Sequence, residues 1–334
     1  MPELSFDVVG IGNAIVDVLT QADDALVEAQ GLPKGGMTLI DGSQAESLYD
    51  EMGPAREISG GSAANTLAGV ASLGGRAAFI GKVRNDQLGG IFRHDIRAAG
   101  VHFETPPATS GPPSGRSLIF VTPDAQRTMA TFLGAATELG PDDVDAAVVA
   151  AAKVTYLEGY LFDRPAAKAA FVKAAEAARA AGRKVSLTLS DPFCVERHRA
   201  AFRDLVEHHV DLLFANEQEI CALYEVPDFD AALQAVRNHC DVAALTRSAQ
   251  GSVVLAGDEV HVVDAAPLDR LVDTTGAGDL YAAGFLFGYT RGDSLYDCGR
   301  IGAIAAAEII SHFGARPEVD LARHLEDCMA APGD

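Results

Sequence analysis

The chain has 334 residues, which is more than one minimal hydrophobic core needs and enough for a large α/β domain with a smaller one attached. Its formal net charge is −21, and an acidic surface of this kind repels nucleic acid and anionic membranes, so neither is an expected partner. The five cysteines are scattered without CxxC spacing, and the longest apolar stretch is too short to span a membrane. We therefore expect a cytoplasmic protein with reduced thiols.

The first half of the chain mixes strand-like and helical segments. Helical patterns that end at glycine alternate with apolar β-prone runs, and two later β-prone runs flank a Pro123-Asp124 turn, as in a hairpin. The predicted strands are 6–11 and 77–83, the predicted helices are 62–73 and 86–99, and the predicted hairpin joins 117–121 to 128–133.

From about residue 142 the pattern becomes a regular alternation of helix and strand. Short connections between such elements imply a parallel sheet that is covered by helices on both faces. The predicted elements are the helices 164–181, 197–209 and 230–239, the strands 184–189, 211–215 and 242–246, a hairpin of 252–255 with 259–263, and the helices 278–289 and 295–312.

Two β-prone segments, 14–42 and 105–133, interrupt this alternation. We interpret them as one small, discontinuous β-sheet that covers the main domain as a lid. The large α/β domain, which is expected to bind nucleotide and substrate, then comprises residues 1–13, 43–104 and 134–334. The fold class is α/β, with three layers in the order α/β/α and a mostly parallel central sheet.

The most informative motif is Asp273-Thr274-Thr275-Gly276-Ala277-Gly278-Asp279, which opens an apolar helix. Gly276 and Gly278 allow successive backbone amides around Ala277 to point at one spot, where the helix dipole favours an anion such as a transferring phosphoryl group. The carboxylate of Asp279 follows at once and could take a proton from an attacking hydroxyl. The competing interpretation is a glycine-rich turn with an aspartate as helix cap.

Three further groups of residues follow predicted strands or open helices. Gly60 and Gly61 precede a helix that carries Asn65, where a ligand could approach the backbone closely. Asn13 and Asp17 follow the first strand, and the carboxylate of Asp17 could accept two hydrogen bonds from a vicinal diol. Helix capping by Asn13 and a solvated Asp17 are the alternatives.

Asn216 and Glu219 follow the strand that ends near residue 215. Both offer hard oxygen atoms, spaced so that they could hold a hydrated Mg²⁺ ion near phosphates. An N-cap with an acidic first helical turn explains the same residues equally well.

Together, Gly60-Gly61 with Asn65, Asn216 with Glu219, and the 273–279 motif resemble the ribokinase-like (PfkB) carbohydrate and nucleoside kinase family. The resemblance runs over nearly the whole chain and in the same order. Within the family, Gly10-Ile11-Gly12-Asn13-Ala14-Ile15-Val16-Asp17, Gly31-Leu32-Pro33-Lys34-Gly35 and Leu187-Thr188-Leu189-Ser190-Asp191-Pro192-Phe193 are similar to the adenosine kinase subfamily.

The resemblance implies that Asp279 is the catalytic base, that residues 276–278 form the anion hole, and that Asp17 binds ribose hydroxyls. It also implies ATP contacts at Asn216, Thr246, Gly251 and Thr275, and a site for a monovalent cation such as K⁺ at Asp273 and Thr275. Ser248 departs from the family, which usually has glycine at that position.

These features predict a kinase that uses ATP and Mg²⁺ to phosphorylate the 5′-hydroxyl of adenosine, working as a monomer or homodimer. Arg127 on the lid hairpin is expected to add positive charge. Phe120, Phe132 and Phe162 are candidates for stacking on a purine, although core packing explains each of them as well.

Other functions can be compared with the same residues. A sugar kinase of the ribokinase or fructokinase type, or a broader ribonucleoside kinase, remains open. A nucleoside sensor without catalysis is disfavoured, because both the base and the anion hole are present. Dinucleotide-binding and P-loop proteins are excluded, because Ile15 stands where the third glycine of GxGxxG belongs and no GxxxxGK[ST] motif occurs.

Overall fold

The structure is a computed structural model that describes residues 3–124 and 126–330. Its centre is an eight-stranded sheet in the order β13-β12-β11-β10-β9-β8-β1-β5. The strands from β11 to β5 run parallel, and the hairpin β12–β13 adds two antiparallel strands at one end. The strands are β1 (Phe6–Ile11), β5 (Ala77–Ile80), β8 (Ala152–Glu158), β9 (Lys184–Thr188), β10 (Leu212–Asn216), β11 (Val242–Thr246), β12 (Ser252–Ala256) and β13 (Glu259–Val263).

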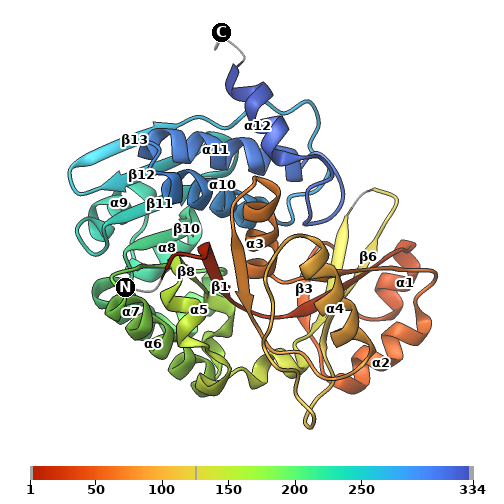
Figure 1. Ribbon diagram of the computed structural model, residues 1–334. Helices are drawn as coiled ribbons and strands as arrows, with labels where there is room; N and C mark the ends of the chain where they lie inside the picture. The colour runs from red at the N-terminus through yellow and green to blue at the C-terminus, as the bar shows by residue number, and fades with distance from the viewer. Residues whose placement is uncertain (1–2, 125, 331–334) are drawn as a thin grey trace.

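Helices cover both faces of this sheet, so the large part of the molecule has three layers (Figure 1). One layer contains α3 (Ser62–Ser72), α10 (Ala277–Arg291) and α11 (Leu295–Ile309), with α12 (Leu321–Ala330) beside them. The other contains α5 (Ala146–Ala150), α6 (Pro165–Ala180), α7 (Pro192–His208), α8 (Glu217–Tyr224) and α9 (Phe229–Val236).

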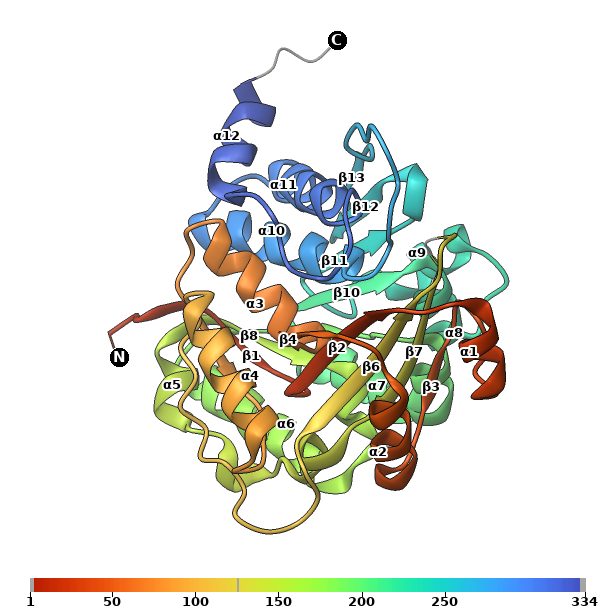
Figure 2. The ribbon, with the colours of Figure 1, turned by 90° about the vertical axis from the view of Figure 1, so that its right-hand side faces the viewer.

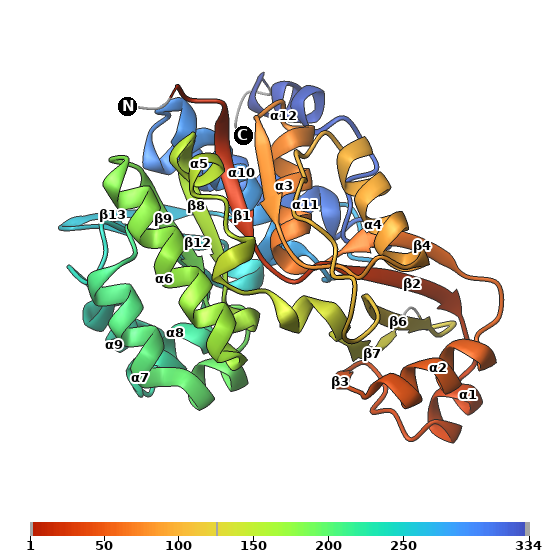
Figure 3. The ribbon, with the colours of Figure 1, turned by 60° about the horizontal axis from the view of Figure 1, so that its bottom comes forward.

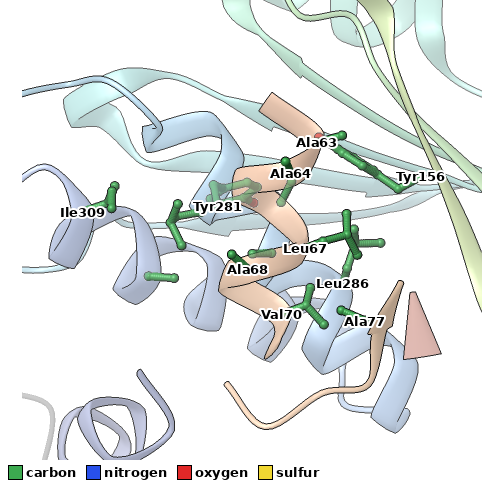
Figure 4. Close-up of a cluster of buried hydrophobic side chains, with 14 of the residues drawn as sticks. Ala63, Ala64, Leu67, Ala68, Val70, Ala77, Tyr156, Tyr281, Leu286 and Ile309 are labelled. Atoms are coloured by element: carbon green, nitrogen blue, oxygen red, sulfur yellow. The ribbon is translucent and has the colours of Figure 1, made fainter. Parts of the chain in front are cut away.

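The alternation of side chains along the buried strands divides the core into two clusters. Val8 of β1 faces one cluster and Val9 faces the other, because successive strand residues point to opposite faces. The first cluster brings α3 against α10 through small residues, among them Ala64 and Ala68, and it extends to Ile309 of α11 (Figure 4). The predicted three-layer α/β/α fold is confirmed.

A second, five-stranded sheet in the order β3-β7-β6-β2-β4 lies beside this body, as the view in Figure 2 shows. It contains β2 (Ile15–Gln21), β3 (Met37–Leu39), β4 (Arg56–Gly60), β6 (Gly115–Val121) and β7 (Arg127–Phe132). The helices α1 (Asp24–Ala29), α2 (Gly42–Glu51) and α4 (Gln87–Ala98) lie on the same side of the molecule (Figure 3).

The membership of this sheet differs from the predicted lid in one strand. Arg56–Gly60, which the sequence pattern assigns to the large domain, pairs antiparallel with β2 and forms an edge of the small sheet. Only Ile58 is a large apolar residue in this strand, so no alternating pattern marks it. The boundaries of the two domains stay a prediction.

Most of the other predicted elements are present within one to five residues of their predicted ends. The helix predicted at 197–209 begins earlier, at Pro192, because Asp191 caps its first turn, and a kink at His198 interrupts its helical backbone. The elements β8, α2, α5 and α12 were not predicted from the sequence, and α1 is a helix within the segment 14–42 that was predicted to be β-prone. The helix α8 was anticipated only as the alternative interpretation of Asn216 and Glu219. Among the described residues, no helix has the length and apolar character needed to cross a membrane.

Candidate active site

The predicted site residues converge at one edge of the large sheet, where its parallel strands end. Asn13 follows β1, Glu158 ends β8, and Asn216 ends β10 directly beside Thr246, its partner on β11. The first turns of α3 and α10 carry the remaining polar residues to the same edge. Open α/β sheets bind ligands at this edge because loops, rather than packed strands, line it.

Asp279 lies in the first turn of α10 and is held by two side chains of α3. Ser62 Oγ donates to Asp279 Oδ1 over 2.6 Å, and Asn65 Nδ2 donates to Oδ2 over 3.0 Å. Burial raises the pKa of Asp279, whereas these two hydrogen bonds and the positive charge of Arg316 lower it. The Oδ1 atom of Asn65 is buried without a partner among the described residues, so this amide can still accept a hydrogen bond from a ligand.

Asp17 lies on β2 and faces the same region. The pKa of Asp17 is raised to about 6, chiefly by burial; the charges of Arg127 and Arg316 lower it, and the charge of Asp279 adds a smaller upward effect. A Cβ atom on Gly60 would lie 2.5 Å from the Asp17 carboxyl group, so only glycine leaves room for this side chain. No described residue hydrogen-bonds to the Asp17 carboxylate, which leaves both oxygens open to a ligand.

Asn13, which follows β1, lies against Gly61, which precedes α3. Gly61 has a φ of 99°, and a Cβ there would meet the carbonyl oxygen of Asn13 at 2.2 Å. Asn13 is only 3% exposed and donates through Nδ2 to Glu158 Oε1 over 2.6 Å. The other oxygen, Glu158 Oε2, accepts from the backbone amide of Ala63 over 2.8 Å. Asn13 is therefore part of a buried support beneath α3.

The N-terminus of α10 matches the predicted anion hole in its backbone. Gly276 is the N-cap residue with a φ of 80°, and its position has no side-chain cap, unlike the starts of α2, α4 and α8. A Cβ on Gly278 would meet no atom outside its own helix within 4 Å, so open space lies beside the first turn of α10. The amide of Ala277 already donates to the carbonyl oxygen of Thr274 over 3.2 Å. Amides at a helix start that lack a partner within the helix favour an anion at this position.

The predicted ATP residues are arranged around two neighbouring strands and the start of α10. Asn216 and Thr246 are paired across β10 and β11, and Gly251 follows the short 3₁₀ turn Ser248–Gln250 that leads into β12. Ser248, the departure from the family pattern, has a φ of 51°. This left-handed conformation explains why glycine is usual there, since a residue with a side chain adopts it at a cost. Thr275 donates its amide to Asp273 Oδ1 over 3.0 Å.

The contacts of Glu219 bear on the predicted Mg²⁺ site. Asn216 and Glu219 form a capping box, in which Asn216 N and Nδ2 donate to the two carboxylate oxygens over 2.9 and 2.7 Å. Burial raises the pKa of Glu219 to about 7. The described residues contain no cluster of three or more His, Cys, Asp or Glu side chains that could hold a metal. This arrangement fits an ion carried by phosphates and contacted through water, rather than one held directly by the protein.

The surroundings of Asp273 bear in the same way on the predicted monovalent cation. Its Oδ2 atom accepts from the amide of Gly314 over 3.2 Å and lies 2.8 Å from Arg127 Nη1, and both side chains of this ion pair are 5% exposed. Arg127 belongs to β7, so the pair joins the small sheet to the loop before α10. Because a guanidinium already neutralises the Asp273 carboxylate, the residues at Asp273 and Thr275 do not fit an additional cation in this arrangement.

The three candidate aromatic residues differ in their surroundings. Phe120 is 1% exposed and belongs to the first core cluster. Phe162 is 4% exposed and stacks on Phe202 with ring centroids 4.5 Å apart. Core packing therefore accounts for both. Phe132, at the end of β7, is partly exposed and stays a candidate for a ligand contact.

Two residues of the site were not anticipated from the sequence. Glu158 supports Asn13 and α3, as described above, and Arg316 donates to the backbone of β4 and α3. Neither belongs to a motif, because a glutamate at a strand end and an arginine in a loop are both common. The only signal for Glu158 is indirect: a buried Asn13 amide needs a hydrogen-bond partner, and the sequence around Asn13 offers none.

A glycine-rich helix start beside a carboxylate that could take a proton, above an open α/β sheet, is the arrangement of an ATP-dependent kinase that acts on a hydroxyl group. The model of the pfkB family carbohydrate kinases matches residues 38–321. The chain therefore belongs to the pfkB family.

Solved structures and a curated relative are consistent with this family. The chain is 56% identical to the adenosine kinase from Sinorhizobium meliloti, with a TM-score of 0.90 over 96% of this chain and 99% of that one. It is 52% identical to a probable sugar kinase from Rhizobium etli, with a TM-score of 0.92 over 98% and 99% of the two chains. It is 33% identical to an ATP-dependent ribose-1-phosphate kinase from Halopiger xanaduensis, over 69% of this chain and 73% of the relative.

Proposed function

We propose that the protein transfers the γ-phosphoryl group of ATP to the 5′-hydroxyl of adenosine, giving AMP and ADP. The observation that carries this proposal is the pair of carboxylates at the sheet edge. Asp279 is fixed by Ser62 and Asn65 beside the anion hole, and Asp17 presents open oxygens close enough for the two charges to interact. One carboxylate can act on the hydroxyl that reacts while the other holds the ribose diol.

In the proposed reaction, Asp279 accepts the proton of the 5′-hydroxyl while the 5′-oxygen forms a bond to the γ-phosphorus of ATP. The bond from this phosphorus to the bridging oxygen breaks, and ADP leaves. The amides of residues 276–278 would hold the transferring oxygens. Mg²⁺ bound to the polyphosphate would neutralise its charge, with Glu219 in contact through water. Asn216, Thr246, Gly251 and Thr275 would surround the nucleotide.

The preference for adenosine over a free sugar rests on two supports. The first is the identity of 56% to the adenosine kinase from Sinorhizobium meliloti, which extends over almost the full length of both chains. The second is the group of apolar residues on the face of the small sheet that Asp17 shares, Ile15 and Leu19 of β2 and Ile119 of β6. A purine gains from apolar surroundings, whereas a free sugar needs polar partners for its anomeric hydroxyl.

A sugar or sugar-phosphate acceptor is the second candidate function. It is favoured by the likeness to the probable sugar kinase from Rhizobium etli and to the ribose-1-phosphate kinase from Halopiger xanaduensis. These acceptors carry a hydroxymethyl group and vicinal hydroxyls as adenosine does. The residues that bind the diol therefore cannot separate the two candidates, and the acceptor must be measured.

The test is a panel of acceptors assayed with ATP and Mg²⁺: adenosine, guanosine, cytidine, ribose, fructose and ribose 1-phosphate. We expect the kcat/KM for adenosine to exceed that for every other acceptor. The Asp279→Asn variant is the control that separates enzymatic transfer from a contaminating kinase. A kcat/KM for ribose, fructose or ribose 1-phosphate above the value for adenosine would replace the proposal with the second candidate.

A further inference from the structure

Arg316 lies in the loop between α11 and α12, and its guanidinium reaches two elements of the site. Nε and Nη2 donate to the carbonyl oxygen of Ser59 over 3.1 and 2.9 Å, and Nη2 also donates to Ser59 Oγ over 2.8 Å. Nη1 donates to the carbonyl oxygen of Ala64 over 2.7 Å. Ser59 belongs to β4 and Ala64 to α3, so one side chain clamps both ends of the Gly60-Gly61 connection.

The same loop also contacts Asp273, in the loop before α10, and Gly276, at the start of α10. The amide of Gly314 donates to Asp273, and a Cβ on Gly276 would lie 3.1 Å from the Cβ of Ala315. Three consecutive residues therefore contact the loop before α10, the first residue of the anion hole, and the segment that leads into α3. That segment carries Ser62 and Asn65, which hold Asp279.

The charge of Arg316 is as unusual as its contacts. The pKa of Arg316 is lowered to about 10, because burial outweighs the opposing effect of the acidic groups Asp95, Asp17 and Asp279. Asp95 of α4 accepts from Ser59 N and Oγ over 2.7 and 2.6 Å, so it meets the guanidinium through Ser59. Arg127, the other cation near Asp17, is already paired with Asp273.

We propose that Arg316 is a positioning residue for phosphoryl transfer, which fixes the segment from Ser59 to Asn65 and places its positive charge against the segment whose Ser62 and Asn65 hold the Asp279 carboxylate. The inference rests on the proposed function only in taking Asp279 as the base. It requires no particular acceptor. An arginine suits both tasks, because its planar fork serves several carbonyl acceptors at once and its charge persists when it is poorly solvated.

Arg316 acts among several other groups that face Asp279. From α3 these are Ser62 and Asn65, from β2 Asp17, from β8 Tyr156 and Glu158, and from the turn after β8 Tyr160. Asp17 and Glu158 carry negative charge when ionised and oppose the ionisation of Asp279. Arg316 is the cation whose charge lowers the pKa of Asp279, so its removal should raise that pKa.

The experiment compares Arg316→Gln, Arg316→Lys and the control Arg323→Gln, whose side chain is exposed on α12. The pH profile of kcat is measured with ATP, Mg²⁺ and adenosine. We expect Arg316→Gln to lower kcat at least tenfold. The pH at which kcat declines on the acidic side of the profile should rise by about one unit. Arg316→Lys should also lower kcat, because one ammonium group cannot make all the hydrogen bonds of the guanidinium. The acidic side of its pH profile should stay where it is in the wild type, because the positive charge is kept. The control should change neither quantity.

A second measurement makes the test independent of the acceptor. The carboxyl ¹³C signal of Asp279, identified by its absence in Asp279→Asn, is titrated without substrate in the wild type and in both Arg316 variants. The midpoint should rise in Arg316→Gln and remain unchanged in Arg316→Lys. An unchanged midpoint in Arg316→Gln would overturn the proposal even if adenosine is confirmed as acceptor. Should Arg316→Gln fail to fold, a midpoint that moves by about one unit in Arg316→Lys overturns it equally.

Discussion

At the scale of single residues, Asp279 offers the most direct test of the proposed chemistry. Ser62 and Asn65 hold its two oxygens, so Asp279→Asn keeps the shape of the side chain and removes the base. Loss of a general base typically lowers the rate by ~10²–10⁴-fold, and we expect Asp279→Asn to lower kcat by at least that factor. Binding of adenosine, measured by calorimetry, should change only a few-fold. Near-native turnover would show that another group accepts the proton.

Asp17 is expected to account for much of the affinity for the acceptor. Each hydrogen bond to a charged group contributes roughly 1.5–3 kcal/mol, so two bonds to the diol amount to about 3–6 kcal/mol. Asp17→Ala should therefore lower kcat/KM for adenosine by roughly 10²–10⁴-fold and leave the KM for ATP nearly unchanged. Asp24→Ala, an exposed carboxylate of the small sheet region that pairs with Lys34, is the matched control.

The 2′-deoxy analogue tests the same contact without a mutation. With the wild-type protein, 2′-deoxyadenosine should lose the contribution of about one of these hydrogen bonds. Equal use of adenosine and 2′-deoxyadenosine would remove Asp17 as the residue that binds the diol. Asp17→Ala should also reduce the discrimination between the two nucleosides, because the bond that distinguishes them is then absent from both.

At the scale of elements, Glu158 is the contact that fixes the start of α3 to the ends of β1 and β8. Burial raises the pKa of Glu158 from 4.5 to about 7, against the hydrogen bonds from Ala63 and Asn13, which lower it. A raised carboxyl pKa means that the folded protein binds this proton more tightly than the unfolded chain. The resulting stability is present below pH 4.5 and is lost as the pH rises toward 7.

Glu158→Gln should therefore flatten the decrease of thermal stability between about pH 5 and pH 8. The contribution of this group to the free energy of unfolding is up to about 3 kcal/mol over that interval. The measurement is Tm as a function of pH, with the exposed Glu138→Gln as the control. If the Tm profiles of wild type and Glu158→Gln run parallel, Glu158 has an ordinary pKa in the folded protein.

The start of α8 combines a structural role with a proposed one, and the two can be separated. Removing the Glu219 half of the capping box should cost about 1 kcal/mol of stability. If Glu219 also contacts hydrated Mg²⁺, Glu219→Ala should raise the Mg²⁺ concentration needed for half-maximal rate. Glu217→Ala, in the same first turn and paired with Arg247, is the control. An unchanged Mg²⁺ titration would leave Glu219 with the capping role alone.

At the scale of the whole molecule, the ion pair between Arg127 and Asp273 joins the small sheet to the loop before α10. Because this guanidinium neutralises the carboxylate, we expect kcat in KCl and in choline chloride of equal ionic strength to agree within about twofold. Arg127→Ala leaves a buried charge unpaired, and its activity should become dependent on K⁺. Strong activation of the wild type by K⁺ would instead support the cation site at Asp273 and Thr275.

The sequence was sufficient for the three-layer fold and for the motif around Asp279, because both depend on local patterns. Apolar strands that alternate with helices predict a parallel sheet wherever they occur, and glycines before an aspartate mark a helix start. Glu158 and Arg316 could not be predicted in this way. Their partners Asn13 and Ser59 lie 145 and 257 positions away, and only the folded chain brings them together.

The placement of β4 also determines how this architecture can be recombined. Arg56–Gly60 pairs with β2 in the small sheet, yet it continues without a break through Gly61 into α3, which holds the carboxylate of Asp279. A chimera that exchanges only residues 14–42 and 105–133 between relatives would leave one edge strand of the recipient sheet in place. The small sheet is therefore not a separable unit, and a graft that aims to transfer it intact must include a third segment, Arg56–Gly60, which is anchored in the body of the enzyme through α3.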